Sequence, residues 1–170
     1  MPVEKEEIRS EITRTLGDVQ AVLDVGSGNC DLVLFLAREI AQEAVGIDIN
    51  GHIHHECINV EGDDAAHTAR CVHMDAGDMT DLEDDRFDAV VSTHALHEID
   101  NPQAALAEIR RVLKPRGILF IADFTDGETR WDEDYFTPAQ VREMLHGAHF
   151  QSIAVQKVPG EAFMYARASK

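Results

Sequence analysis

The sequence predicts a doubly wound α/β fold in a single domain, with a mostly parallel, seven-stranded sheet whose last strand is antiparallel. Three observations carry this prediction. Short apolar runs alternate along the chain with segments whose apolar residues recur with a helical period. A glycine turn joins the first apolar run to the first of the helical segments that follow it. The last two apolar runs are separated only by Pro159-Gly160, which is typical of an antiparallel pair.

The predicted elements follow one another in a regular order. An amino-terminal helix at residues 4–16 places Ile8, Ile12 and Leu16 on one face and ends at Gly17. The predicted strands are residues 21–25, 44–49, 70–74, 87–92, 118–124, 151–158 and 161–168. Further helices are predicted at residues 31–41, 102–113 and 137–146. We expect residues 1–18 to form a helix over the binding cleft and residues 19–170 to form the core.

The segment VLDVGSGNCDLV, residues 22–33, combines a buried strand, a glycine turn and a helix start. Gly26 and Gly28 allow positive φ and a close approach of the backbone to a ligand. Asp48 ends the second strand 20 residues after Gly28, where a carboxylate can accept hydrogen bonds from two ribose hydroxyls. The turn therefore predicts a nucleotide-type cofactor site. Asp31 stands where the dinucleotide fingerprint has its third glycine, which weakens a nicotinamide reading.

Five segments together resemble the class I S-adenosylmethionine-dependent methyltransferases in order and spacing. They are DVGSG at 24–28, GIDI at 46–49, DA at 75–76, FDAVVS at 87–92 and LKPRGIL at 113–119. The resemblance covers residues 20–168 and implies a Rossmann-like methyltransferase that uses S-adenosyl-L-methionine. Combined with the acidic composition, it indicates a haloarchaeal member. Two alternatives stay open, an NAD-dependent oxidoreductase and a non-catalytic adaptor that retains the fold.

The resemblance also implies where the cofactor binds. Its assigned residues are Asp24, Gly26, Ser27, Gly28, Asn29, Asp48, Ile49, Asp75, Ala76, Ser92 and Thr93. Asp24 and the glycine backbone would hold the amino acid end of the cofactor, Asp48 the ribose, and Ile49 the adenine face. Asp75 and the backbone of Ala76 would form hydrogen bonds with the adenine amino edge. Asp78, in the same loop, is the alternative candidate for this role.

The methyl acceptor is expected beside residues 92–98, after the fourth strand. Here Thr93-His94-Ala95-Leu96 stands where amide- and adenine-methylating relatives carry Asn-Pro-Pro-Tyr, which argues against those acceptors. His94 and His97 are candidate general bases, because imidazole titrates near neutrality. A packing role is the alternative for His97, because relatives with unlike substrates carry a histidine there. The acceptor itself is not predicted.

Composition narrows the function further. The chain has a net charge of −17, from 32 acidic and 15 basic residues, and only four of the basic residues are lysines. This balance gives no nucleic-acid signal and is typical of cytoplasmic proteins of salt-loving organisms. No apolar run reaches the roughly 20 residues of a membrane span, and the first residues show no targeting pattern. We therefore expect a cytoplasmic protein with no membrane partner.

Cysteine and histidine patterns predict no metal site. Cys30, Cys57 and Cys71 are an odd number at no metal-ligand spacing, so free thiols are expected. The cluster HIHHEC at residues 52–57 matches no metal motif and is expected to be a solvated loop. Cys30, at a predicted helix start, is a minor candidate for a reactive thiol.

In the family that this chain resembles, the strand that corresponds to residues 70–74 is normally an edge of the sheet. Residues 51–68, which precede it, have a poor helical period, and the strand itself contains no proline or lysine. Some archaeal and eukaryotic methyltransferases that resemble this chain bind a zinc-ribbon activator, so we predict a small activating subunit at this edge. The alternative is that residues 51–68 cover it. Because the chain has no long insertions, the acceptor is either a small molecule or a macromolecule that a partner presents.

Overall fold

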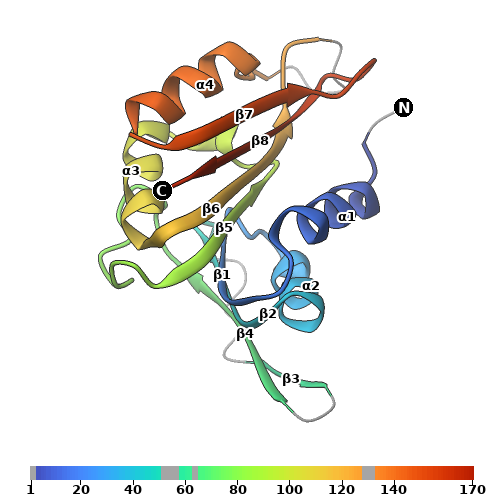
Figure 1. Cartoon of the computed structure of the whole chain (residues 1–170), viewed down its shortest axis with the longest axis vertical. Coiled ribbons are helices and arrows are strands. Elements are labelled where there is room, and N and C mark those ends of the chain that lie inside the picture. The colour runs from blue at the N-terminus through green and yellow to red at the C-terminus, as the bar shows by residue number, and fades with distance from the viewer. Residues whose placement is uncertain (1–2, 51–57, 63–64, 128–132) are drawn as a thin grey trace.

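The computed structural model describes residues 3–50, 58–62, 65–127 and 133–170 of the chain (Figure 1). Its strands form one sheet in the order β3-β4-β2-β1-β5-β6-β8-β7. They are β1 (Val19–Val25), β2 (Ala41–Asp48), β3 (Ile58–Gly62), β4 (Ala65–His73), β5 (Phe87–Thr93), β6 (Leu113–Phe124), β7 (Gln151–Lys157) and β8 (Phe163–Ser169). The helices are α1 (Lys5–Leu16), α2 (Asp31–Glu39), α3 (Pro102–Val112) and α4 (Pro138–Gly147), and a single 3₁₀ turn, η1, spans Leu96–Glu98.

The sheet has the strand order of a doubly wound fold, which confirms the predicted fold class. β4, β2, β1, β5 and β6 are parallel, and β8 pairs antiparallel with both β6 and β7. The order reverses at β1, from which the chain proceeds to β2 and β4 on one side and to β5 and β6 on the other. The carboxyl ends of β1 and β5 therefore lie side by side at the switch point, where such sheets bind ligands.

Helices cover both faces of the sheet. The apolar residues of α1 and α2 belong to one core cluster, and those of α3 and α4 belong to another on the opposite face (Figure 1). Local sequence fixes where the latter two begin. The side chains of Asn101 and Thr137 each accept a hydrogen bond from a first-turn amide, and a proline occupies the first turn of both helices.

All seven predicted strands are present, and an eighth, β3, pairs antiparallel with β4. β4 begins at Ala65, five residues before the predicted start at Arg70, and the pairing with β3 runs from Ala65 to Ala69. Residues 58–62 thus pair with β4 only up to Ala69, and the predicted edge from Arg70 onward lies beyond this pairing. The predicted loop at residues 52–57 lies outside the described residues.

None of the described helices is long and apolar enough to cross a membrane. The longest of them, α1, has 12 residues, against the roughly 20 that a bilayer requires.

Candidate functional site

The glycine loop between β1 and α2 lies at the switch point. Gly26 has a φ of 80°, and its amide donates to Ile47 O at 2.9 Å. A Cβ at this position would clash with the Cβ of Ala95, which follows β5. Gly28 has a φ of 49° and no atom within 4 Å of where its Cβ would lie. Gly26 is therefore required for packing between two strand ends, whereas Gly28 leaves open space beside the loop.

Asp48, at the end of β2, is held by two backbone amides. Its Oδ2 accepts from Gly28 N at 2.8 Å, and its Oδ1 accepts from Asn50 N at 2.8 Å. These bonds fix the carboxylate against the glycine loop. Each oxygen keeps a second lone pair, which suits the two hydroxyls of a ribose.

Asp24 is the most unusual group of the site. The residue is 1% exposed, and its Oδ1 has no hydrogen-bond partner among the described residues. Burial, followed by the nearby charge of Asp48, raises the pKa of Asp24 to about 7. A buried polar atom without a partner costs free energy, so this oxygen is expected to have a partner when a ligand is bound.

The other predicted cofactor residues occupy the same end of the sheet. Ile49 follows β2 and is 57% exposed, so its side chain is accessible to a ligand. Ser27 is buried in the loop, while Asn29 forms hydrogen bonds with Asp31 at the start of α2. Ser92 is buried in β5, and its Oγ has no partner among the described residues.

Asp75 and Asp78 remain rivals for the adenine edge. Both are exposed in the turn after β4. Asp75 Oδ1 accepts from Gly77 N at 2.7 Å, and Asp78 N donates to Asp75 O at 3.1 Å. Asp75 thus caps the turn, which leaves its second carboxylate oxygen for a ligand, and Ala76 packs partly against the core.

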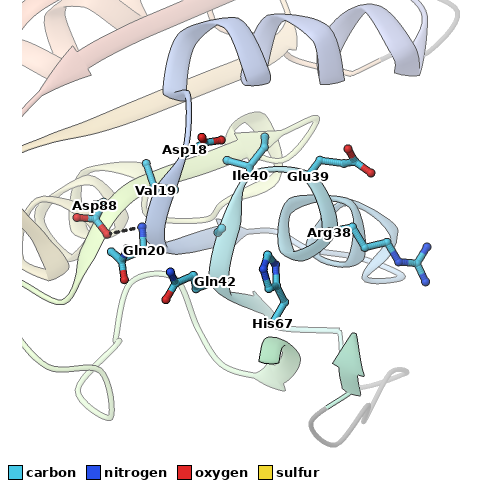
Figure 2. A pocket seen from close by; sticks show the side chains of 10 residues that line it. Asp18, Val19, Gln20, Arg38, Glu39, Ile40, Gln42, His67 and Asp88 are labelled. Carbon is cyan, nitrogen blue, oxygen red and sulfur yellow. Dashed lines mark hydrogen bonds between the residues drawn. The ribbon is translucent and has the colours of Figure 1, made fainter. Parts of the chain in front are cut away.

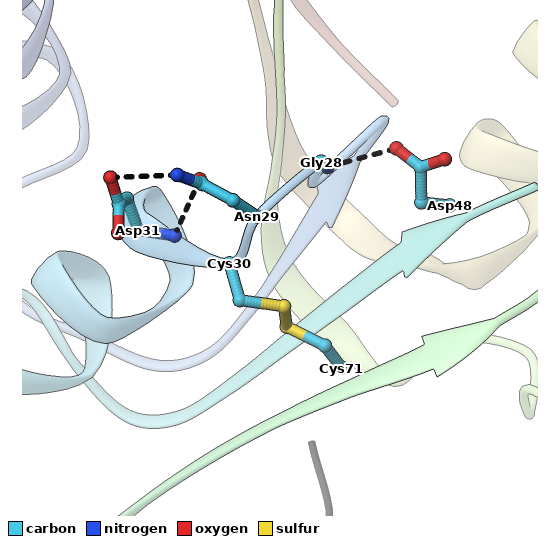
Figure 3. The surroundings of a disulfide bond; sticks show 6 residues. All are labelled: Gly28, Asn29, Cys30, Asp31, Asp48 and Cys71. Atoms are coloured by element: carbon cyan, nitrogen blue, oxygen red, sulfur yellow. Dashed lines mark hydrogen bonds between the residues drawn. A yellow bond between two sulfur atoms is a disulfide. The ribbon is translucent and has the colours of Figure 1, made fainter. Parts of the chain in front are cut away.

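The prediction of free thiols is wrong for two of the three cysteines. Cys30 and Cys71 form a disulfide with a Cα–Cα distance of 6.4 Å (Figure 3). Cys30 precedes α2 with a φ of 64°, and Cys71 lies on β4, so the bond joins the glycine loop to the strand beyond β2. The sequence could not reveal this pair, because 41 residues separate the two cysteines and only the parallel β2–β4 pairing brings them together.

His94 lies on the acceptor side, directly after β5. Its backbone has a φ of 53°, and its ring packs at 5.0 Å from that of Phe124 and at 5.4 Å from that of Phe163. Desolvation beside these rings lowers the pKa of His94 against the opposing charge of Asp123, and the charge of His97 lowers it further, although the residue as a whole stays exposed. The imidazole is therefore held toward its neutral form.

His97, in η1, is bound on both ring nitrogens. Nδ1 lies 2.7 Å from Asp123 Oδ1, and Nε2 lies 3.3 Å from Glu133 Oε2. The His97 side chain is only 6% exposed, and burial alone would lower its pKa. The hydrogen bond to Asp123 and the charges of Asp123, Glu98 and Glu133 outweigh burial and raise the pKa of His97.

Asp123 and Glu133 were not among the predicted site residues. Asp123 is 1% exposed and also accepts from the amides of His97 at 3.1 Å and Phe124 at 2.8 Å. A charged residue at the carboxyl end of the apolar run 118–124 was the available signal for it. No local pattern indicates Glu133, whose contact with His97 joins residues 36 positions apart.

One described pocket lies at the opposite end of the sheet. Figure 2 shows this pocket, of about 460 Å³, beside the amino ends of β1, β2 and β5. Its wall includes Asp18, Arg38, His67 and Asp88, and Asp88 accepts from Gln20 N and Ala21 N. None of the predicted site residues lines it, and doubly wound sheets bind ligands at their other end.

The comparison with protein families agrees with this geometry. Residues 23–121, which include the glycine loop, Asp48 and β5, match the family model described as a methyltransferase domain. The chain belongs to this methyltransferase domain family. Among curated relatives, arginine-hydroxylase NDUFAF5, mitochondrial, of Danio rerio is 30% identical to this chain over 132 residues. That match covers 75% of this chain but only 39% of the relative.

Solved structures support the fold. One similar chain comes from the complex between the Haloferax volcanii Trm112 methyltransferase activator and a methyltransferase, with a TM-score of 0.73 and 16% identity over 95% of this chain and 88% of that one. Another is a SAM-dependent methyltransferase of Methanosarcina mazei, with a TM-score of 0.74 and 19% identity over 100% and 99% of the two chains. The methyltransferase fold expected from the sequence is thus confirmed.

Proposed function

We propose that this protein is an enzyme that transfers a methyl group from S-adenosylmethionine to an acceptor bound beside β5. The observation that carries the proposal is Asp24, a buried carboxyl whose Oδ1 has no partner among the described residues, next to a glycine loop. The ammonium of the methionine end would supply that partner. The family match and the hydrogen bond from Gly28 N that fixes the Asp48 carboxylate also support S-adenosylmethionine as the ligand.

The residues present fit this cofactor. Asp24 would take its ammonium, Asp48 its ribose hydroxyls, and the exposed Ile49 one face of its adenine. When bound, the sulfonium supplies an activated methyl group. The protein then has to hold the acceptor in line and exclude water, and orientation alone can contribute about 7–11 kcal/mol.

For an acceptor that carries a removable proton, we propose His94 as the general base. Its ring lies at the end of β5 and is held toward the neutral form that can accept a proton. His97, the other candidate from the sequence, is almost fully buried and already contacts two carboxylates. We therefore do not propose His97 as the general base.

Calorimetric titration with S-adenosylmethionine, S-adenosylhomocysteine and NAD tests the cofactor. We expect the first two to bind and NAD not to bind. Asp48→Ala should weaken S-adenosylhomocysteine binding by about 2–3 kcal/mol, because it removes hydrogen bonds between a charged group and the ribose hydroxyls. Asp81→Ala, at an exposed site after β4, removes the same charge and should leave the affinity unchanged.

Selective NAD binding, or an Asp48→Ala variant with wild-type affinity, would contradict the proposal. Labelled cofactor added to native extract at native salt then tests catalysis. Wild-type protein should label a component of the extract, and His94→Ala should label it more slowly. An extract that stays unlabelled while the cofactor binds would support the adaptor alternative instead.

We also propose a small zinc-ribbon activating subunit at the β4 edge. β3 pairs with β4 only as far as Ala69, so the second half of β4, from Arg70 to His73, extends past the register of β3. The fold likeness to a chain from a complex with the Trm112 activator supports this idea. The proposal fails if the purified chain is monodisperse, stable and fully active alone.

Finally, we propose that α1 closes one side of the cofactor site. Lys5 Nζ lies 3.0 Å from Asp31 Oδ2, which brings the first turn of α1 to the start of α2 beside the glycine loop. Ile8, Ile12 and Leu16 bury the helix in the same core cluster as α2. Deletion of residues 1–18 should therefore weaken cofactor binding, as calorimetry would show.

Location in the cytoplasm and adaptation to high salt stay predictions.

A further inference from the structure

We propose that His97, Glu98 and Glu133 form a binding site for a divalent first-row transition metal such as Mn²⁺ or Zn²⁺. His97 and Glu98 belong to η1 after β5, and Glu133 belongs to the segment between β6 and α4. One ligand atom from each of the three side chains lies within 4.8 Å of the other two. Three protein ligands on one side leave the remaining coordination positions open.

The buried Asp123 carboxylate provides an independent indication of a metal site. It lies 2.7 Å from His97 Nδ1 and is itself fixed by the amides of His97 and Phe124. Metal-binding histidines almost always donate their second ring N–H to such a carboxylate, which fixes the tautomer and directs the other nitrogen at the metal. Asp123 lies outside the ligand set and holds the ring in this orientation.

The contact between His97 and Glu133 requires a cation. Glu133 Oε2 lies 3.3 Å from His97 Nε2 and also accepts a hydrogen bond from Tyr135 Oη at 3.1 Å. With Nδ1–H donated to Asp123, a neutral His97 ring would direct the lone pair of Nε2 at this oxygen. Two acceptors do not attract each other, so either a proton or a metal ion must lie near them. Glu98 places a second carboxylate within reach, and a divalent ion can bind both carboxylates and His97 Nε2 at once, which a single proton cannot.

The donor set indicates the kind of metal. One imidazole nitrogen and two carboxylates suit Mn²⁺, Fe²⁺ or Zn²⁺ better than Ca²⁺, which prefers oxygen ligands alone. Glu98 and Glu133 are exposed, so solvent reaches this side of the site, while His97 and Asp123 close the other. The site follows β5 and β6 on the acceptor side of the proposed cofactor site, and its existence does not depend on methyl transfer.

Titration of the whole chain with Mn²⁺ tests the site by electron paramagnetic resonance, in molar KCl to suppress non-specific binding. We expect one saturable Mn²⁺ per chain and a nitrogen coupling from the imidazole. Glu133→Gln should abolish saturable binding, whereas Glu83→Gln, the same change at another exposed glutamate, should retain it. Asp123→Asn keeps all three ligands and should weaken affinity about 10–100-fold.

A wild-type chain with no saturable site would overturn the proposal, and the cation near His97 would then be a proton. Equal binding by Glu133→Gln and Glu83→Gln would overturn it too, because only the overall negative charge would be responsible. If Glu133→Gln fails to fold, as circular dichroism would show, Glu98→Gln serves as the second variant with the same expectations. A signal without nitrogen coupling in a folded wild-type chain would likewise exclude His97 as a ligand.

Discussion

Asp24 shows how burial gives a common residue an uncommon property. The carboxyl has the same chemistry as the exposed Asp75, yet its pKa is raised to about 7 by burial and by the charge of Asp48. Because the folded-state pKa lies above the unfolded value, Asp24 contributes most to stability below about pH 4. That contribution is lost as the pH rises through about 7.

The same shift predicts a pH-dependent cofactor affinity. An ammonium group binds the ionised carboxylate, so we expect affinity for S-adenosylhomocysteine to rise about tenfold per pH unit below about pH 7. Above that pH the affinity should level off. Calorimetry across this range measures the effect, and binding below about pH 7 should also release a proton to the buffer.

Asp24→Asn is the matched variant for this measurement. It keeps the size of the side chain and cannot ionise, so its affinity should be weaker than that of the wild type at high pH and independent of pH. A wild-type affinity that is flat across the range, or an Asp24→Asn variant that keeps the full slope, would show that Asp24 does not bind the ammonium.

At the scale of elements, the disulfide joins the start of α2 to β4 across β2 (Figure 3). Closing a loop between residues 41 positions apart restricts the unfolded chain. The chain-entropy model gives a stabilisation of about 4 kcal/mol for a loop of this length. The bond therefore stabilises the fold and ties the glycine loop of the proposed cofactor site to β4.

Reduction, or Cys71→Ser, is expected to lower the free energy of unfolding by about 2–4 kcal/mol. Urea unfolding with and without reductant measures this change. The control is Cys57→Ser, which removes the third cysteine and should leave the response to reductant intact. A wild-type chain whose unfolding is insensitive to reductant would show that Cys30 and Cys71 are not joined in solution.

At the scale of the whole molecule, the net charge of −17 opposes the compact state. Salt screens this repulsion, since the Debye length falls from about 10 Å at 0.1 M to about 3 Å at 1 M. Acidic residues outnumber basic residues by 32 to 15, so repulsion between like charges is the main electrostatic effect. Salt is therefore expected to act on stability through long-range repulsion.

We expect the melting temperature to rise steadily between low salt and molar KCl. A variant with Asp81→Asn, Glu83→Gln and Asp134→Asn, three exposed sites, should melt higher at low salt and respond less to KCl. Calorimetric melting of both chains in a KCl series gives the two slopes. Equal slopes, or a melting temperature that does not change with salt, would show that repulsion is not the cause.

A comparison of predicted and observed elements shows which features depend on neighbouring residues alone. Helix starts such as Thr137-Pro138 were predicted correctly, because capping depends on neighbours a few residues away. The β3 strand was missed, because residues 51–68 carry no clear period and pairing with β4 decides its conformation. Helix α2 was predicted to reach Ala41, but this residue opens β2 and pairs with Val19.

The sequence by itself determined the order of strands and helices, the glycine turn and the position of Asp48, because each depends on residues that are close along the chain. Only the tertiary structure decided that Cys30 forms a disulfide with Cys71 and that the Asp123 carboxylate contacts the His97 ring. It also left the buried Oδ1 of Asp24 without a hydrogen-bond partner among the described residues. The physical reason is that burial, pKa and side-chain partners depend on residues brought together from distant segments, and no local period encodes those contacts.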